Sequence, residues 1–568
     1  MNKNMVSENT RILMMQLPFW APLIPPQGIA RLKTYLNMNG YNNVVTIDAN
    51  VETQFKNIYE DYFNHAKEYI PDELHGNFYD NGHDVFRLHL MAHLNCKVEK
   101  DYIHLAGLLF DSIYLYIPSN QEIINLNKII DSFYTKLETY FLSLMKEYDP
   151  EIIGFSLHSG NFPATIFLSE LVRKIRPDTK IILGGSMFAG ELRQETPDFE
   201  MFIKRTGNLF DKIFIGLSER ALYKYLRGEL PEDKKVICQE DLNEKIMTIN
   251  SFVKPDLSDF DLSKYSTIAS YTSLSCTNEC SFCNEKSFWG EYQKRDLSLA
   301  VNEIVKSYEE YKPGYFFMLD VMLNHTIDDF SKAIIETKLP IYYDGYLRVS
   351  EDSCDYEKCM TWRQGGLYRV RMGLESGSQK LLDDMKKGIT VEQSKQTLHN
   401  LAKVGIKTTG YFVIGHPGET EEDFIKTLNF IEESKDNFWQ IEPHVFNYMH
   451  TGQNSGDIWS ENRSLIYPEK YNEHLICTRW KIDLEPNRNT VFERLLRFVK
   501  HCDKLGIKNP YYSYEKYNAD LRWKRLHKNA VPSTLELDSH NFTDTVRGIE
   551  DRIEAAIIKD DSNGDFAF

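Results

Sequence analysis

The stretch Ser275-Cys276-Thr277-Asn278-Glu279-Cys280-Ser281-Phe282-Cys283 places three cysteines within eight residues, at the spacing Cys-x3-Cys-x2-Cys. An apolar run, Ile268 to Leu274, leads into it, as expected of a buried strand that ends at a loop. Three thiolates on one short loop can hold three irons of a four-iron, four-sulfur (4Fe–4S) cube and leave the fourth iron without a protein ligand. An open iron can bind and transform a small molecule, so the spacing predicts a catalytic cluster on Cys276, Cys280 and Cys283.

Two other metal sites compete with this interpretation. Structural zinc requires a fourth cysteine or histidine at close spacing, and none lies near the loop. Ferredoxin-type clusters use four cysteines, so three are the wrong number for simple electron storage. The open cluster is therefore the leading interpretation, and zinc remains the alternative.

Length and composition limit the class of protein. The 568 residues are enough for about three domains. The formal charge of −17, from 83 acidic and 66 basic residues, disfavours a nucleic acid as the main partner, because phosphate neutralisation needs a basic surface. No apolar run is long enough to span a bilayer, and nine cysteines without framework spacing are typical of a reducing compartment. We therefore expect a cytoplasmic protein without a membrane partner.

The N-terminal third predicts an α/β domain, a doubly wound parallel sheet. Apolar runs expected to be strands, at residues 11–17, 44–48, 151–156, 180–183 and 211–216, alternate with helical patterns. Residues 51–148 interrupt this alternation with a long helical insertion. Ligands of such sheets bind beyond the carboxyl ends of the strands, where the sequence places Ser156, His158, Ser159, Gly184, Gly185 and Gly216.

The following region predicts a partial (β/α)6 barrel. After a charged linker at residues 231–263, strands expected at 265–274, 315–319, 341–349, 368–372, 409–414 and 440–446 alternate with helices. The chemistry of such barrels lies at the carboxyl ends of the strands. We expect the sheet domain at 1–230, the barrel at 264–448, and a small C-terminal α-rich cap at 449–568 that helps to close the barrel.

Three segments of the barrel region together resemble the radical S-adenosylmethionine (radical SAM) superfamily. They are the cysteine triad, Gly-Leu-Glu-Ser-Gly-Ser at 373–378 and Ile-Gly-His-Pro-Gly-Glu-Thr at 414–420. The resemblance implies that the amino and carboxylate groups of SAM occupy the open iron. It also implies SAM contacts from Phe282, Asp320, Arg348, Glu375, Ser376 and Gly415. The expected second strand reads Phe317-Met318-Leu319-Asp320 where many relatives have Gly-Gly-Glu.

The N-terminal sheet resembles the cobalamin-binding domains found ahead of radical SAM domains. The matching segments are Gly154 to Ser156 with Ser159 and Asn161, Ile182 to Gly185, and Ile215-Gly216 with Glu219. This resemblance implies cobalamin contacts from Ser156, His158, Ser159, Gly184, Gly185, Gly216 and Glu219. The pattern Asp-x-His-x-x-Gly, which supplies a lower histidine ligand in other cobalamin proteins, is replaced by Asp48-Ala49-Asn50-Val51-Glu52-Thr53. A sheet that binds no cofactor stays the alternative.

The two resemblances imply an oxygen-sensitive enzyme with a 4Fe–4S cluster, SAM and cobalamin. Cleavage of SAM at the cluster would yield a 5′-deoxyadenosyl radical, and cobalamin would serve the C-methylation of an unactivated carbon in a peptide or natural-product intermediate. Its partners would be that substrate and an electron donor such as flavodoxin or ferredoxin. Two alternatives stay open. One is a cobalamin radical SAM enzyme that rearranges, epimerises or cross-links its substrate, and the other is a cobalamin or redox sensor without turnover.

Overall fold

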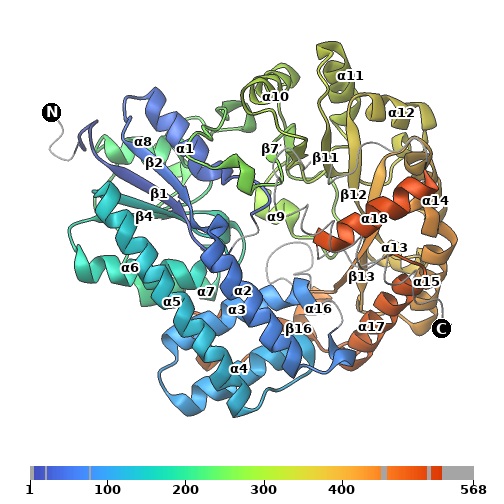
Figure 1. Cartoon of the computed structure of the whole chain (residues 1–568), viewed down its shortest axis with the longest axis horizontal. Coiled ribbons are helices and arrows are strands. Elements are labelled where there is room, and N and C mark those ends of the chain that lie inside the picture. The colour runs from blue at the N-terminus through green and yellow to red at the C-terminus, as the bar shows by residue number, and fades with distance from the viewer. Residues whose placement is uncertain (1–4, 20–21, 76–77, 449–456, 508–512, 528–568) are drawn as a thin grey trace, which may run out of the picture.

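The computed structural model describes residues 5–19, 22–75, 78–448, 457–507 and 513–527 (Figure 1). Two parallel β-sheets of six strands each organise this part of the chain. In Figure 1 they stand on opposite sides of the molecule, and α9 (Glu285–Trp289) lies in the region between them. The α/β fold class expected from the sequence is confirmed.

The N-terminal sheet has the strand order β2-β1-β3-β4-β5-β6, and all neighbouring strands run parallel. Its strands are β1 (Ile12–Gln16), β2 (Val44–Asp48), β3 (Ile152–Ser156), β4 (Lys180–Gly184), β5 (Lys212–Phe214) and β6 (Val236–Ile237). All five residues of β1 are buried, as expected of a central parallel strand. The chain winds in opposite directions from β1 and from β3, so the switch point where such sheets bind ligands lies between these strands.

Helices cover both faces of this sheet, because alternate residues of β1 enter two different hydrophobic cores. Leu13 and Met15 belong to one core, and Ile12 and Met14 to the other. On the second face α1 (Gln27–Met38) packs against α8 (Glu219–Leu226). On the first face lie α6 (Phe162–Ile175) and α7 (Pro197–Thr206).

The expected helical insertion consists of four helices packed on the first face. They are α2 (Thr53–Tyr69), α3 (Phe78–Asn95), α4 (Glu99–Tyr114) and α5 (Asn120–Tyr148). The start of α5 is set by a capping box, in which the Ser119 hydroxyl accepts from Glu122 N while the Glu122 carboxylate accepts from Ser119 N. The apolar stripe of α5, which includes Leu137, Phe141 and Leu144, lies in the core shared with the sheet. The insertion is therefore a cover for one face of the sheet.

The second sheet has the order β14-β13-β12-β11-β10-β7, again with all neighbours parallel. Its strands are β7 (Ile268–Ser270), β10 (Phe316–Met318), β11 (Tyr343–Tyr346), β12 (Leu367–Glu375), β13 (Lys407–Ile414) and β14 (Gln440–Val445). The connecting helices are α10 (Leu297–Tyr311), α11 (Ile327–Thr337), α12 (Tyr356–Gln364), α13 (Gln379–Asp384), α14 (Val391–Lys403) and α15 (Glu421–Ser434). Strands adjacent in sequence are adjacent in space, which confirms the predicted partial (β/α)6 barrel.

The first strand of the barrel is shorter than the sequence predicts. The apolar run 265–274 divides into β7, which ends at Ser270, and β8 (Ser273–Leu274), which pairs antiparallel with β9 (Gln293–Lys294). Hydrogen bonds to a buried carboxylate divide the run into two strands. The buried Asp320 carboxylate accepts from Thr272 N at 2.9 Å and from the Ser273 hydroxyl at 2.7 Å, so these residues bond to a side chain and leave the sheet. Hydropathy alone does not reveal such a bond.

The predicted linker at residues 231–263 is more tightly packed than expected. Its first part contains β6, the sixth strand of the N-terminal sheet. Its second part is fastened to α1 and β2, because Asp259 accepts from Thr46 N at 2.8 Å and pairs with Lys33 at 2.7 Å. The Tyr265 hydroxyl, just before β7, also donates to Asp48 at the end of β2. These polar contacts fix the sheet domain against the start of the barrel.

The described C-terminal residues contain a short β-ribbon as well as helices. They form α16 (Asp457–Glu461), the antiparallel pair β15 (Arg463–Leu465) and β16 (Trp480–Ile482), α17 (Arg488–Lys504) and α18 (Ser513–Leu526). Packing of α17 on β13 and β14 agrees with a cap on the barrel. However, residues 467–477 enter the core of the helical insertion. The cap therefore contacts both halves of the molecule, and residues 449–456, 508–512 and 528–568 of it lie outside the described residues.

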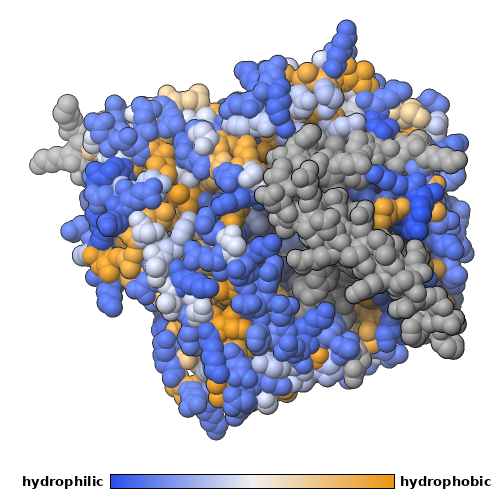
Figure 2. Space-filling view, in the orientation of Figure 1, coloured by the Kyte–Doolittle hydropathy of each residue, from blue (hydrophilic) through white to orange (hydrophobic). Residues whose placement is uncertain are grey.

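The described helices include none that is both long and apolar enough to cross a membrane. On the face shown in Figure 2, apolar residues form separate areas between polar ones.

Candidate functional site

The three predicted cluster ligands lie on the loop between β8 and α9. Cys280 is buried, while Cys276 and Cys283 are partly exposed. The loop is anchored to the segment after α13, because Ser281 N donates to the Met385 carbonyl at 2.9 Å. Ser275 enters the loop with a left-handed backbone (φ 68°) and donates its hydroxyl hydrogen to the Gly290 carbonyl. The loop is thus held at both ends by bonds that do not involve a metal.

Each cysteine sulfur accepts a hydrogen bond from an N–H group. Asn278 N donates to Cys276 Sγ at 3.4 Å, Glu285 N donates to Cys283 Sγ at 3.5 Å, and Arg348 Nη1 donates to Cys280 Sγ at 3.2 Å. Donors of this kind stabilise metal-bound thiolates and tune the potential of iron–sulfur clusters. Burial raises the pKa of Cys283 to about 11, so a bound metal is needed to keep it a thiolate at neutral pH. This environment fits the ligands of a cluster.

Within the described residues, no three His, Cys, Asp or Glu side chains converge on a single ion position. The ligands of a four-iron cube bind three separate irons and need no common point.

Among the residues implied to contact SAM, three lie close to the cysteine loop. Arg348 follows β11 and reaches Cys280, as described above. Phe282 lies on the loop itself, with Lys387 Nζ 5.8 Å from the centre of its ring. The Glu375 carboxylate, at the end of β12, accepts from Lys387 Nζ at 2.6 Å, and both side chains are buried. Lys387 is a site residue that no sequence motif indicated.

Asp320, also implied to contact SAM, is hydrogen-bonded to the turn that precedes the cysteine loop. Its side chain is fully buried, and both carboxylate oxygens accept hydrogen bonds from the Thr272–Ser273 turn. Burial raises its pKa to about 6, opposed by those hydrogen bonds. The carboxylate therefore shapes the approach to the cysteine loop, and its contact with SAM stays a prediction.

Ser376 and Gly415 line the same end of the barrel as Glu375. The Ser376 hydroxyl contacts Thr427 on α15 at 3.0 Å and accepts from Ser378 N. Gly415 has φ 82°, and a Cβ atom there would lie 2.4 Å from Val491 of α17, so close packing requires glycine. Both residues have structural partners in this protein, and their contact with SAM stays a prediction.

The loop after β13 is further held by a buried ion pair from the cap. Glu419 accepts from Gly415 N at 3.0 Å and from Arg494 Nη1 of α17 at 2.9 Å. Burial raises the pKa of Glu419 to about 7, although Arg494 opposes the shift. The cap thus sets the position of a loop that the resemblance places beside the adenine of SAM.

The residues predicted to contact cobalamin lie at the carboxyl edge of the first sheet. His158 contacts two hydroxyls, Ser186 Oγ at 2.7 Å from Nδ1 and Ser156 Oγ at 3.3 Å from Nε2. Burial lowers the pKa of His158 to about 4, so the imidazole is neutral at pH 7. Ser159 lines the cavity described below. The predicted serines and the histidine are therefore brought together at one edge.

The predicted glycines differ in their structural reasons. A Cβ atom on Gly185 (φ 128°) would lie 2.3 Å from the Leu157 carbonyl oxygen, and one on Gly184 would lie 3.3 Å from the Phe214 carbonyl oxygen. Packing of neighbouring strand ends explains these two glycines without a cofactor. Gly216 (φ 83°) is exposed, and a Cβ atom there would meet only Gln239 Nε2, at 3.9 Å. Gly216 thus leaves room for a ligand at the edge.

The segment that begins at Asp48 is in the wrong place for a lower cobalt ligand. It follows β2, whereas the switch point lies between β1 and β3. Asp48 instead accepts from the Tyr265 hydroxyl at 2.9 Å and from Asn50 N at 3.0 Å. The loop that borders the switch point follows β1, at residues 17–26, and it contains no histidine either.

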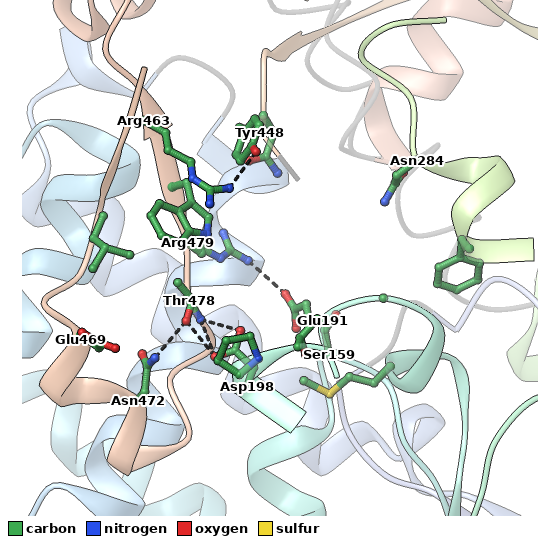
Figure 3. Close-up of a pocket in the computed structure, with 18 of the residues that line it drawn as sticks. Ser159, Glu191, Asp198, Asn284, Tyr448, Arg463, Glu469, Asn472, Thr478 and Arg479 are labelled. Carbon is green, nitrogen blue, oxygen red and sulfur yellow. Dashed lines mark hydrogen bonds and ion pairs between the residues drawn. The ribbon is translucent and has the colours of Figure 1, made fainter. Parts of the chain in front are cut away.

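A cavity of about 570 Å³ lies between the two halves of the molecule (Figure 3). The sheet domain contributes Ser159, Ser186, Met187, Gly190, Glu191, Thr196, Pro197 and Asp198. The barrel contributes Asn284 just before α9, Phe288 on α9, and Asn447 and Tyr448 from the segment after β14. The cap contributes Arg463, Leu465, Glu469, Asn472, Thr478, Arg479 and Trp480. Figure 3 shows Asn284 across the cavity from Arg463 and Arg479. The cavity thus borders both the sheet edge and the helix after the cysteine loop.

The cap wall of the cavity is held by charges. Arg479 pairs with Asp84 of α3 at 2.6 Å and with Glu191 at 3.5 Å, and Arg87 bonds to the same two carboxylates. Arg463 lies over the Trp480 ring at 4.1 Å. These residues were missed from the sequence because they carry no motif and reach the cavity from a distant segment.

A family model matches part of the barrel region. Residues 270–431 match the family model of the Radical SAM superfamily. The chain therefore contains a radical SAM domain, and such a domain implies a 4Fe–4S cluster and SAM as cofactors.

Over most of its length the chain also shares the fold of two solved enzymes. One is the radical SAM methyltransferase TsrM from Kitasatospora setae, solved with tryptophan and a SAM analogue, with a TM-score of 0.59 and 14% identity over 91% of this chain and 99% of that one. The other is the cobalamin-dependent SAM radical enzyme OxsB, with a TM-score of 0.55 and 15% identity over 91% of this chain and 72% of that one. The shared fold is a sheet domain joined to a radical SAM barrel.

Curated relatives match part of the chain. An uncharacterised methyltransferase of Pyrococcus horikoshii is 24% identical over 320 residues, 54% of this chain and 69% of the relative. An anaerobic magnesium-protoporphyrin IX monomethyl ester cyclase of Rubrivivax gelatinosus is 24% identical over 309 residues, 50% of this chain and 54% of the relative. The chain thus spans only about half the length of the cyclase.

Proposed function

We propose that this chain is a cobalamin-dependent radical SAM methyltransferase that methylates an unactivated carbon of a peptide or natural-product intermediate. The observation that carries the proposal is the position of the cavity. One wall comes from the loops after β3 and β4, at the edge where doubly wound sheets bind ligands, and another comes from α9, directly after the cysteine loop. A cofactor on the sheet and a radical source at the barrel would therefore meet a substrate in one space.

The chain's residues would serve the cluster and SAM in distinct ways. Cys276, Cys280 and Cys283 would hold the cluster, and the Arg348 guanidinium, 3.2 Å from Cys280 Sγ, would offset its negative charge. When bound and reduced, the cluster supplies the electron that cleaves SAM. Glu375 and the loop at Gly415 would orient SAM, and their burial would keep water away from the reacting atoms.

Cobalamin fits the carboxyl edge of the first sheet. Ser156, His158 and Ser159 offer hydroxyl and neutral imidazole groups there, and Gly216 leaves open space. TsrM has been solved with cobalamin and a 4Fe–4S cluster, and OxsB with aqua-cobalamin, which supports the same cofactor in this fold. Without a histidine at the switch point, the cofactor would lack a lower histidine ligand from that loop.

The volume and lining of the cavity indicate the size and polarity of the substrate. Its volume of about 570 Å³ lies in the range that encloses drug-sized molecules, about 300–1,000 Å³. Phe288 and Trp480 offer aromatic surfaces for an apolar part, while Asn284 and Glu469 offer hydrogen-bonding groups. A small metabolite or a single side chain of a peptide would fit this space.

The test is anaerobic incubation of the cluster-reconstituted chain with SAM, hydroxocobalamin and dithionite. We expect both 5′-deoxyadenosine, which reports radical cleavage, and S-adenosylhomocysteine, which reports loss of the methyl group from SAM. Cys280→Ala should abolish 5′-deoxyadenosine, and Cys238→Ala, which changes a cysteine outside the loop, should not. Absence of both products from the wild-type chain would refute an enzymatic role and favour a sensor.

A second candidate is a cobalamin radical SAM enzyme that does not methylate. The cyclase among the relatives favours it, since its name describes ring closure. The same assay separates the two functions, because this enzyme would yield 5′-deoxyadenosine without S-adenosylhomocysteine.

A further inference from the structure

Helix α9, which follows the cysteine loop, has no core of its own. It is five residues long, it lies between the two sheets (Figure 1), and none of its residues is fully buried. So short a helix is unstable by itself, because nucleation fixes several residues for few hydrogen bonds. The position of α9 must therefore be set by contacts from other parts of the chain.

The sheet domain supplies these contacts through the loop after β4. Arg193 Nη1 donates to the Ser287 carbonyl at 2.7 Å and to the Ser287 hydroxyl at 2.6 Å. A Cβ atom on Gly190 would lie 3.6 Å from the Phe288 ring, so the loop and α9 pack closely. Within the described residues, Arg193 is the one side chain from outside residues 275–294 that forms a hydrogen bond with α9.

Arg193 is itself fixed to the sheet domain. Its carbonyl accepts from Thr196 N at 2.9 Å and from the Thr196 hydroxyl at 2.7 Å, and that hydroxyl also accepts from Phe199 N as the cap of α7. Its Nε donates to the Glu195 carboxylate at 2.6 Å. The turn at the start of α7 therefore holds Arg193 in place, and Arg193 in turn holds α9.

On its other side, α9 contacts the third expected cluster ligand. Glu285 N, in the first residue of α9, donates to Cys283 Sγ at 3.5 Å. Cys280 and Ser281 are held instead by the barrel, through Arg348 and the Met385 carbonyl. Hydrogen bonds to cluster sulfurs raise the reduction potential, because they stabilise the more negative reduced state. The surroundings of Cys283 thus depend on where α9 lies.

We propose that Arg193 is a positioning residue for Cys283, an inference that rests on the proposed cluster ligands but not on cobalamin. Arg193 fixes Ser287, and through α9 it fixes the Glu285 N–H group that donates to the Cys283 sulfur. The sheet domain therefore sets the geometry of one corner of the cluster, although all three cysteines belong to the barrel. Separation of Arg193 from α9 changes the cluster as well as the packing of the two halves.

The first experiment is a redox titration of the cluster-reconstituted chain, without cobalamin or substrate, followed by electron paramagnetic resonance. Arg193→Leu should change the signal of the reduced cluster and lower its midpoint potential. At the wild-type midpoint the ratio of reduced to oxidised cluster should fall about three- to tenfold, as expected for the loss of one hydrogen bond. Arg205→Leu, which removes an exposed arginine from α7 and the same charge, should change neither.

Two milder variants separate position from charge. Arg193→Lys keeps the charge on a shorter side chain without the guanidinium plane, and Ser287→Ala removes one acceptor and no charge. Each should lower the potential in the same direction by a smaller amount, and circular dichroism checks that each variant is folded. If only Arg193→Leu lowers the potential, the charge of Arg193 acts and the positioning role is overturned.

Thermal stability gives the remaining comparison. A lower Tm in Arg193→Leu with an unchanged signal and potential would overturn the proposal, because Arg193 would then only join the two halves of the molecule. Such a result leaves the proposed function intact. If the wild-type chain assembles no 4Fe–4S cluster, the proposed function fails together with this inference.

Discussion

Replacing Lys387 with methionine should destabilise the barrel and weaken SAM binding. Lys387 Nζ lies 2.6 Å from Glu375 Oε1, and the two side chains are only 8% and 7% exposed. Glu375 also has a left-handed backbone (φ 62°), which an L-residue adopts only when its surroundings hold it there. Without Lys387, the Glu375 carboxylate would be a buried and unpaired charge at the end of β12.

The size of the stability loss follows from the burial of Lys387 and Glu375. Removal of one partner of a buried ion pair costs about 3–5 kcal/mol, because the remaining charge is neither solvated nor paired. We expect a loss of about 3 kcal/mol, since methionine still fills most of the space of the lysine stem. For a domain of about 150–250 residues, this corresponds to a fall in Tm of about 6–12 °C.

The assay is thermal unfolding of the reconstituted chain, together with equilibrium binding of SAM. Lys386→Met is the matched control, since Lys386 is exposed and adjacent, and it should leave Tm within 1–2 °C, about the effect of 0.5 kcal/mol or less. The double variant Lys387→Met/Glu375→Gln removes the buried charge and should recover at least half of the lost Tm. If the single variant melts like the wild type, or the second change recovers nothing, the ion pair does not hold the end of β12.

Four further substitutions test other contacts. Burial raises the pKa of Asp48 to about 6, above its ordinary value of 3.8. Between these pH values the folded chain therefore binds one more proton than the unfolded chain. The free energy of unfolding falls as pH rises through this window. Asp48→Asn should remove that slope, about 3 kcal/mol in total, in urea unfolding measured from pH 4 to 7, and an unchanged slope would contradict the assignment. Tyr265→Phe should raise the pKa of Asp48 further by removing its hydrogen bond, and should thereby move the upper end of the window to higher pH. Gly415→Ala should reduce the free energy of unfolding by about 1–3 kcal/mol, and so lower Tm, because the new Cβ atom would collide with Val491. Val491→Ala in the same chain should recover part of the loss. If the loss came only from the backbone conformation of glycine, the second substitution would recover nothing. Arg479→Met should reduce the free energy of unfolding by about 2–4 kcal/mol, because Asp84 and Glu191 would each lose an ion-pair partner. Limited proteolysis should then cut near β16 faster than in the wild type. Equal cutting rates would show that the cap is held by its apolar contacts alone.

The features that sequence reasoning predicted correctly are local ones. The apolar runs of β2 and β3 and the helical periods of α8 and α14 each lie within a few to a dozen residues. Regular alternation of such elements is enough to predict two parallel sheets, because parallel strands need crossover helices. The boundaries of the domains remain predictions, and so do the cofactor contacts of individual residues.

Tertiary structure decided whatever depends on segments distant in the chain. Asp320 takes Thr272 and Ser273 out of the first barrel strand, which no pattern within residues 265–274 reveals. Lys387 meets Glu375, and Arg494 meets Glu419, only because separate elements pack together.

The same contrast applies to the loop from Cys276 to Cys283. Its spacing alone indicates three iron ligands, because covalent neighbours cannot move far apart. The guanidinium beside Cys280, the cavity wall formed by α9, and the sheet edge opposite come from parts of the chain up to hundreds of residues away. Ligand identity is a property of short-range sequence, whereas the surroundings that direct the chemistry of those ligands depend on long-range packing, which is set by the burial of many side chains at once.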